Sequence, residues 1–116
     1  MIKACKDIQD SLVTMRRDLH MIPELGLELP ETADYVRTKL EEFGIEYTIN
    51  EGDSGIIGYI NKGKQGKVIA LRADMDALPI TEETGAEYAS THTGKMHACG
   101  HDAHTAMLLG TAQVLN

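Results

Sequence analysis

Hydrophobic residues recur every three or four positions along the first part of the chain, which is the period of an amphipathic helix. The first stripe predicts a helix over residues 3–21 that is stopped by Pro23. The second predicts a helix that follows Pro30 and ends at Gly44, because glycine suits the left-handed position after a helix. We expect both stripes to face the core. They comprise Cys5, Ile8, Leu12, Met15, Leu19 and Ile22, and then Ala33, Val36, Leu40 and Phe43.

The pattern then changes to one that favours strands. Residues 45–49 and 55–60 predict two short strands, and residues 62–66 predict the turn that follows them. Residues 67–73 (Lys-Val-Ile-Ala-Leu-Arg-Ala) give the strongest strand signal. Their nearly continuous apolar character predicts burial on both faces, as in the centre of an α/β sheet.

A polar connection over residues 79–94 leads to a third helical pattern over residues 103–116. Apolar side chains cover most of this helix, so we expect partners on several of its sides. Two helices, then sheet strands, then a buried helix predict an α/β layered domain. The last pattern carries no Gly or Pro stop signal and ends in mid-pattern, so we expect a truncated chain rather than a natural C-terminus.

Composition and charge narrow the classes of function. The 116 residues suffice for one domain or part of one, and the net charge of −7 argues against nucleic acid or an anionic membrane as partner. Neither a signal peptide nor an apolar segment long enough to span a bilayer is evident. Two cysteines make no disulfide framework, so we expect a reducing, cytoplasmic setting. There Cys5 would be a small core residue, and Cys99 would be available as a thiolate ligand.

Metal-ligand side chains concentrate between Met96 and His104, where three His, one Cys and one Asp fall within nine residues. Imidazole and thiolate suit a borderline-soft metal such as zinc. Cys99 and His101 are two positions apart, and a loop at Gly100 would let both face one site. Asp102 opens the predicted last helix, where a capping role is as well supported as a functional one.

A second acidic cluster, Asp74 and Asp76, follows the strongest predicted strand. Positions i and i+2 of an extended chain point to the same side, so both carboxylates can face one site. A carboxylate there can bind a metal or orient a histidine ligand, while a solvated turn that ends in Pro79 is the structural alternative. His20 stands apart from these clusters, and we expect it at the surface or at a helix C-terminus.

The count of ligands is incomplete. A metal that activates water needs about three protein ligands and one open position. Cys99 and His101 with the nearby aspartates supply part of that set, and no side chain is clearly placed as the general base. The residues alone therefore predict a metal site that lacks some of its donors.

Three segments resemble the di-metal amidohydrolases of the aminoacylase/carboxypeptidase metallopeptidase family, in the branch of the hippurate hydrolases and the auxin-conjugate hydrolases. They are residues 16–26 (RRDLHMIPELG), 71–79 (LRADMDALP) and 94–105 (GKMHACGHDAHT). The resemblance implies that Cys99 and His101 bind the metal pair. It places Asp76 where a carboxylate orients a metal ligand and supports catalysis. It implies that Asp74, Asp102 and His104 support the metal ligands and do not bind the metal ions themselves.

The resemblance also implies an enzyme with two divalent metal ions (Mn, Zn, Co or Ni). Such an enzyme hydrolyses the amide bond of N-acyl amino acids such as hippurate to a carboxylic acid and an amino acid. Family members are much longer, and their general base, further histidine ligands and lid domain follow the segments matched here. The resemblance therefore implies that residues 1–116 are the N-terminal portion of the metallohydrolase catalytic domain. It also implies an inactive isolated chain, and a homo-oligomer for the full-length enzyme through the lid.

Two alternatives stay open at this point. The chain can be a stand-alone metal-binding or interaction module that another chain completes. It can also be a structural domain whose histidines only cap helices and pack.

Overall fold

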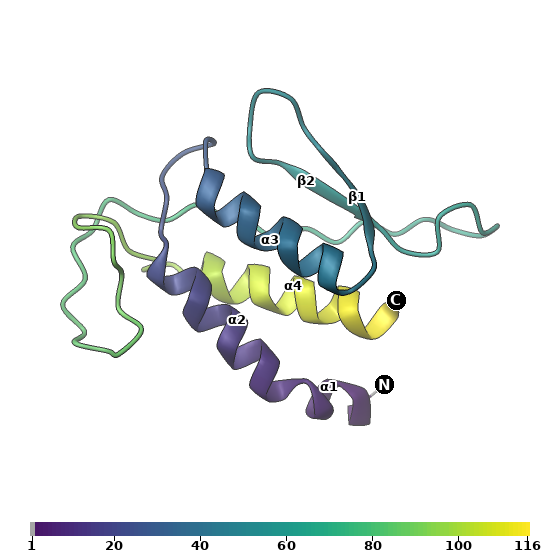
Figure 1. Ribbon diagram of the computed structural model, residues 1–116, viewed down its shortest axis with the longest axis horizontal. Helices are drawn as coiled ribbons and strands as arrows, with labels where there is room; N and C mark the ends of the chain where they lie inside the picture. Colours follow the sequence, from purple (N-terminus) through teal and green to yellow (C-terminus); the bar gives the residue numbers. More distant parts are fainter. Residues whose placement is uncertain (1) are drawn as a thin grey trace.

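A computed structural model describes residues 2–116. Within that range the elements are α1 (Ile2–Asp7), α2 (Gln9–Met21), α3 (Pro30–Glu42), β1 (Glu46–Ile49), β2 (Ile56–Tyr59) and α4 (His101–Leu115), as Figure 1 shows. This order confirms the predicted α/β class, in which helices come first, strands follow and a helix closes the chain. None of the helices in residues 2–116 has the length and apolarity needed to cross a bilayer.

The predicted first helix is interrupted at Ile8, which has φ −101° and ψ 7° and separates α1 from α2. Cys5 on α1 is exposed, so its predicted place in the core is wrong. The physical reason is the break, because the apolar stripe of α2 does not continue as one helix face into α1. The end of α2 at Met21, two residues before Pro23, agrees with the prediction.

The start of α3 is fixed by a residue of the preceding loop. Pro30 is its first residue, and the carboxylate of Glu24 accepts hydrogen bonds from the backbone N–H groups of Glu31 (3.1 Å) and Thr32 (2.8 Å). Those N–H groups have no partner within the helix, and a negative charge is favourable at this end. Glu24 therefore fastens the loop after α2 to α3.

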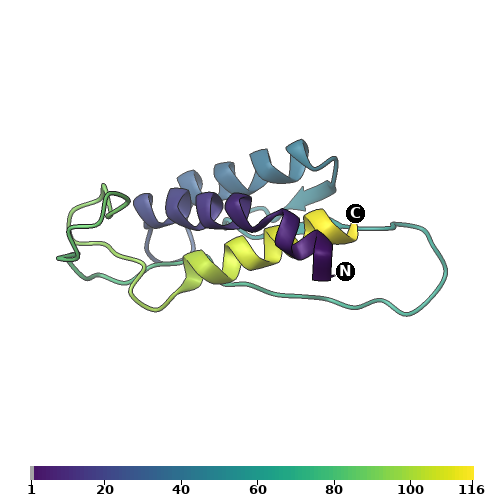
Figure 2. The same cartoon turned by 90° about the horizontal axis from the view of Figure 1, so that it is seen from below.

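Helices α2, α3 and α4 pack around one hydrophobic core, with α4 beneath the other two in Figure 2. A Cβ atom added to Gly110 would lie 2.3 Å from Cδ2 of Leu12, so this glycine permits the close approach of α4 to α2. As predicted, α4 has partners on several sides, since it contacts α1, α2 and α3. The buried core residues are Met15, Leu19, Val36, Leu40, Ile45, Ala106 and Leu109.

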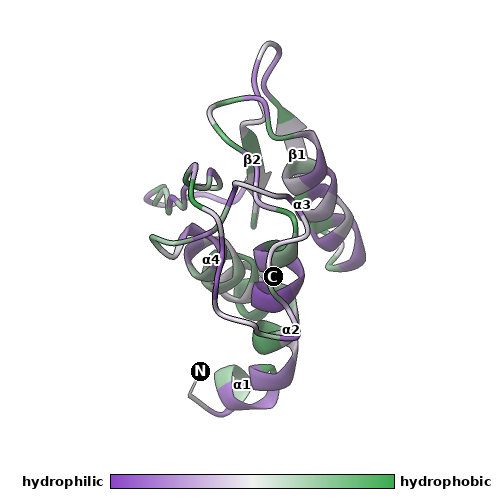
Figure 3. Cartoon of the chain, turned by 90° about the vertical axis from the view of Figure 1, so that its left-hand side faces the viewer, coloured by the Kyte–Doolittle hydropathy of each residue, from purple (hydrophilic) through white to green (hydrophobic). Residues whose placement is uncertain are grey.

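Strands β1 and β2 form an antiparallel hairpin in which Glu46 pairs with Tyr59 and Ile49 pairs with Ile56. The hairpin packs against α3, and Figure 3 shows β2 in the hydrophobic colour beside the mixed colours of that helix. These two strands match the two short strands that the sequence predicted.

The prediction of a buried strand over residues 67–73 is wrong for this structure. The segment is an extended trace that runs outside the helices (Figure 2), and Val68 is 97% exposed and Ile69 81% exposed. A central strand needs a hydrogen-bonded neighbour on each edge, and the one sheet in residues 2–116 is the β1–β2 pair. No backbone hydrogen bond within the described chain reaches residues 67–73.

Candidate metal centre

A pair of backbone hydrogen bonds brings the two predicted site segments together. The N–H of Leu78 donates to the carbonyl of Met96 (2.9 Å), and the N–H of Met96 donates to the carbonyl of Leu78 (3.0 Å). The hydroxyl of Thr105 on α4 also donates to the carbonyl of Asp74 (3.0 Å). Residues 74–78 are thereby held beside the start of α4.

His101 is held at one of its two ring nitrogens. Its Nδ1 lies 2.8 Å from the carbonyl oxygen of Asp76 and 3.0 Å from Oδ1 of the same residue. Because an ionised carboxylate and a carbonyl only accept hydrogen bonds, Nδ1 carries the proton and the lone pair of Nε2 is free for a metal. Asp74 faces the same ring, with its Oδ2 3.9 Å from Nε2. The predicted same-side placement of Asp74 and Asp76 is confirmed.

Gly100 forms the junction between the loop and α4. Its φ of +108° is one that residues with a side chain rarely adopt, and it is the N-cap residue of the helix. Asp102 is therefore not the N-cap, and lies instead in the first turn of α4. The Cys99 thiol, one residue before the junction, is exposed.

The types of donor present suit a metal site. A thiolate from Cys99 and the Nε2 atom of His101 are ligands of the kind that zinc and related divalent ions accept. Within residues 2–116, however, no group of three or more His, Cys, Asp or Glu side chains is arranged to hold a metal ion. The metal-binding roles of Cys99 and His101 therefore stay a prediction.

The two other predicted site residues of α4 have different surroundings. The exposed ring of His104 lies with its centroid 5.6 Å from that of His101, at an interplanar angle of 32°. Asp102 has a fully buried side chain that contacts His20 and Arg16 instead. His104 therefore flanks the candidate ligand, while Asp102 connects the start of α4 to α2.

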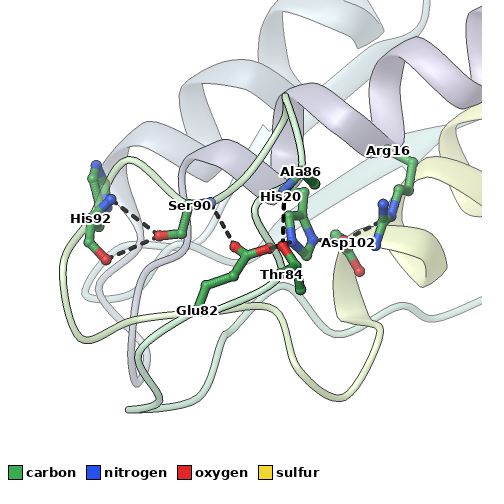
Figure 4. Close-up of polar contacts among 8 residues, drawn as sticks. All are labelled: Arg16, His20, Glu82, Thr84, Ala86, Ser90, His92 and Asp102. Carbon is green, nitrogen blue, oxygen red and sulfur yellow. Dashed lines mark hydrogen bonds and ion pairs between the residues drawn. The ribbon is translucent and has the colours of Figure 1, made fainter.

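His20 lies in the last turn of α2, so the predicted helix C-terminal position is confirmed, but it is buried, so the predicted surface position is wrong. Its side chain is 3% exposed, and its Nδ1 lies 2.6 Å from Oδ2 of Asp102 while its Nε2 lies 3.1 Å from Oε1 of Glu82 (Figure 4). Nε of Arg16 lies 3.0 Å from the same Asp102 oxygen. Sequence reasoning missed this group. The one available signal was the spacing of Arg16 and His20, four apart on one helix face.

Glu82 is held in its ionised form. Desolvation raises the pKa of this carboxyl, but hydrogen bonds from the Thr84 hydroxyl, the Ser90 N–H and His20 outweigh it and lower the pKa from 4.5 to about 2. The Ser90 N–H lies 2.6 Å from Oε2 of Glu82. The connection between residues 80 and 98 is therefore fastened to α2 through a charged group.

His97, two residues before Cys99, lies beside this buried group. It is 4% exposed, and its ring centroid lies 6.3 Å from that of His20. Neither of its ring nitrogens has a hydrogen-bond partner in residues 2–116. Desolvation lowers the pKa of His97, Asp102 opposes that shift, and the nearby charge of His20 adds to it. His97 is thus a neutral ring packed beside charged neighbours.

An α/β domain that presents imidazole, thiolate and carboxylate donors at one loop–helix junction is typical of the metal-dependent hydrolases. Residues 70–116 match the family model described as Peptidase family M20/M25/M40. This match confirms the resemblance to that family seen in the motifs of the chain.

Individual relatives agree with this assignment. The IAA-amino acid hydrolase ILR1-like 5 of Arabidopsis thaliana is 50% identical over 110 residues, which cover 95% of this chain and 25% of that protein. The N-acyl-L-amino acid amidohydrolase of Geobacillus stearothermophilus is 43% identical over 95% of this chain and 30% of its own length. The chain spans about a quarter of the length of the first curated relatives that it matches.

Solved structures match the fold as well. The Bacillus subtilis YXEP protein, described as a dinuclear metal binding peptidase from the M20 family, superposes with a TM-score of 0.89 at 48% identity, over 96% of this chain and 32% of that one. A putative aminohydrolase from methicillin-resistant Staphylococcus aureus gives a TM-score of 0.92 at 46% identity, over 98% of this chain and 29% of that one. The arrangement of α1 to α4 is therefore that of the N-terminal part of an M20 catalytic domain.

Proposed function

We propose that this chain is the N-terminal portion of the catalytic domain of a metal-dependent amidohydrolase that cleaves N-acyl amino acids, hippurate-like ones included. The observation that carries the proposal is the state of His101, whose Nδ1 proton is held by Asp76 and whose Nε2 is left for a metal. The relatives named as amidohydrolases support the reaction class. In this proposal, sequence outside residues 1–116 supplies the rest of the domain and a lid domain that makes the enzyme a homo-oligomer.

Each candidate residue then has a distinct part. Cys99 and His101 hold metal, and Asp76 keeps the His101 ring in one tautomer and one orientation. Asp74, Asp102 and His104 support these ligands without binding the ions. Two divalent ions, drawn from Mn, Zn, Co and Ni, would activate water and stabilise the negative charge that develops on the amide oxygen. The dinuclear description of the solved relative supports the number of ions.

A reducing cytoplasmic compartment belongs to the same proposal. Cys5 and Cys99 are both free and both exposed, which suits surroundings that keep thiols reduced. An oxidised Cys99 could not serve as a thiolate ligand.

The function is tested with the complete natural protein that contains this sequence and, separately, with the 116-residue chain. Both are incubated with hippurate and with a panel of N-acetyl amino acids, in the presence of Mn²⁺, Co²⁺ or Zn²⁺, and amino-acid release is measured. We expect metal-dependent release from the complete protein and none from the isolated chain. A complete protein without metal-dependent turnover on the whole panel would overturn the proposal.

The two cysteines provide a matched pair of variants. With Co²⁺ bound to the complete protein, Cys99→Ser should abolish the thiolate-to-cobalt charge-transfer absorption and strongly reduce turnover. Cys5→Ser makes the same chemical change on α1 and should alter neither. If the two variants behave alike, Cys99 is not a ligand.

A further inference from the structure

A second group of charged residues lies beside the candidate metal centre, and apart from Asp102 its members have no part in the function proposed so far. Arg16 and His20 come from α2, Glu82 comes from the connection before Cys99, and Asp102 comes from the first turn of α4 (Figure 4). The side chains of His20, Glu82 and Asp102 are 3%, 3% and 0% exposed. Charged side chains are costly to bury, so groups placed this deeply must be closely paired.

The geometry sets the charge on His20. Nδ1 faces a carboxylate oxygen at 2.6 Å and Nε2 faces another at 3.1 Å. A carboxylate only accepts hydrogen bonds, so both ring nitrogens must donate, and the ring is an imidazolium. With Arg16 beside Asp102, the group holds two positive and two negative charges in contact. It is therefore a neutral, fully paired cluster.

Both partners of His20 are attached to the loop that carries the candidate ligands. Asp102 directly follows His101 in the first turn of α4, so a shift of Asp102 moves the backbone of His101 as well. Glu82 accepts a hydrogen bond from the N–H of Ser90 at 2.6 Å, which anchors the middle of the segment that leads to Cys99. His20 thus holds both the segment that leads to Cys99 and the first turn of α4, which contains His101.

We propose that His20 is a positioning residue of the candidate metal centre, acting as an imidazolium clamped between Asp102 and Glu82. The inference rests on the function proposed above, because it concerns how the ligands of that site are held. The clamp fixes the junction at Gly100 from both sides, and this keeps Cys99 and His101 in place while no metal is bound. Residues that hold the metal ligands in place affect metal affinity without contacting the metal themselves.

The test compares His20→Gln with His92→Gln in the complete natural protein. Both variants replace a ring by an amide, and His92 also bridges a backbone carbonyl and a carboxylate, since its Nδ1 lies 2.9 Å from the carbonyl of Pro23 and its Nε2 lies 3.4 Å from Glu31. His92 has no contact with α4 among the hydrogen bonds and ion pairs of residues 2–116. The readouts are Co²⁺ affinity, the cobalt absorption spectrum, and kcat and KM separately.

We expect His20→Gln to weaken Co²⁺ binding about tenfold to a hundredfold. We also expect it to change the cobalt absorption bands and to lower kcat with little change in KM. His92→Gln should leave the affinity and the spectrum as in the wild type. A His20→Gln protein that binds Co²⁺ with wild-type affinity and an unchanged spectrum would overturn the positioning role.

A second variant and an NMR measurement also test the role of His20. If His20→Gln does not fold, Glu82→Gln removes one arm of the clamp from the loop side and should weaken Co²⁺ binding in the same direction. Nitrogen-15 NMR of the wild type should show both His20 ring nitrogens protonated, and a neutral His20 would refute the clamp. A wild type that binds no Co²⁺ would refute the proposed function, whereas a binding wild type with unaffected variants would refute the role of His20 alone.

Discussion

Asp76 accepts from a single atom of His101 twice, once through its backbone carbonyl (2.8 Å) and once through its carboxylate (3.0 Å). One acceptor belongs to the chain itself and survives any substitution of the side chain. The carboxylate adds the negative charge, which makes the imidazole a stronger ligand. The two contributions can therefore be separated by mutation.

Asp76→Ala should lower the metal affinity of the complete protein about tenfold to a hundredfold, because His101 loses its charged acceptor. Asp76→Asn should lie between this variant and the wild type, since its amide oxygen can still accept the Nδ1 hydrogen bond. Competition titration with a coloured chelator measures both affinities. Identical affinity in Asp76→Ala and the wild type would show that the backbone carbonyl alone orients His101.

Glu82 predicts a dependence of stability on pH. Its pKa is lowered from 4.5 to about 2 in the folded chain, so its contribution to the free energy of unfolding is complete above pH 4.5 and is lost as the pH falls toward 2. Urea unfolding between pH 7 and pH 3 should therefore show a loss of stability in the wild type that is smaller in Glu82→Gln. Parallel pH profiles of the two proteins would contradict the shifted pKa.

Gly110→Ala should destabilise the chain by about 1–3 kcal/mol, because the added methyl group would overlap the Leu12 side chain. The usual gain of up to about 1 kcal/mol for alanine over glycine in a helix offsets only part of that cost. In a Leu12→Ala background, the same change should cost much less, since the obstructing atoms are gone. Denaturant unfolding of the four proteins in this cycle measures the difference, and equal costs in both backgrounds would contradict the packing argument.

Val68 and Val36 allow a matched test of the segment that the sequence misplaced. Val36→Thr should cost about 1–3 kcal/mol, because it puts a hydroxyl into the core, whereas Val68→Thr should change the stability of the isolated chain by less than about 0.5 kcal/mol. If this chain is the N-terminal portion of a larger catalytic domain, the rest of that domain should cover residues 67–73. Val68→Thr should then reduce the stability of the complete protein. A neutral effect in both contexts would show that these residues stay exposed throughout.

Local patterns predicted the elements and part of the site. The stripes of α2 and α3 and the stop signals after them depend on residues a few positions apart, which a sequence shows directly. The convergence of Asp74 and Asp76 on His101 follows from their alternate positions on an extended segment.

Distant partners account for what the sequence did not predict. The sequence predicts only a surface or helix C-terminal position for His20, because nothing near it indicates that Asp102 and Glu82 surround it. The strand over residues 67–73 was expected in a sheet centre because its composition suits burial, but burial depends on neighbouring strands rather than on the segment itself. The break at Ile8 has no clear signal in the spacing of apolar residues, which continues through it.

The bond between His20 and Asp102 joins residues 82 positions apart in the sequence. Contacts between residues so far apart form late in folding. The entropy of the intervening chain is lost before the contact contributes any stabilising free energy. During synthesis α2 leaves the ribosome well before α4 exists, so His20 has no carboxylate from α4 to meet at that stage. The segment that carries Cys99 and His101 can therefore reach its final conformation only after α4 has packed against α2. Metal binding should then follow the folding of this region rather than drive it.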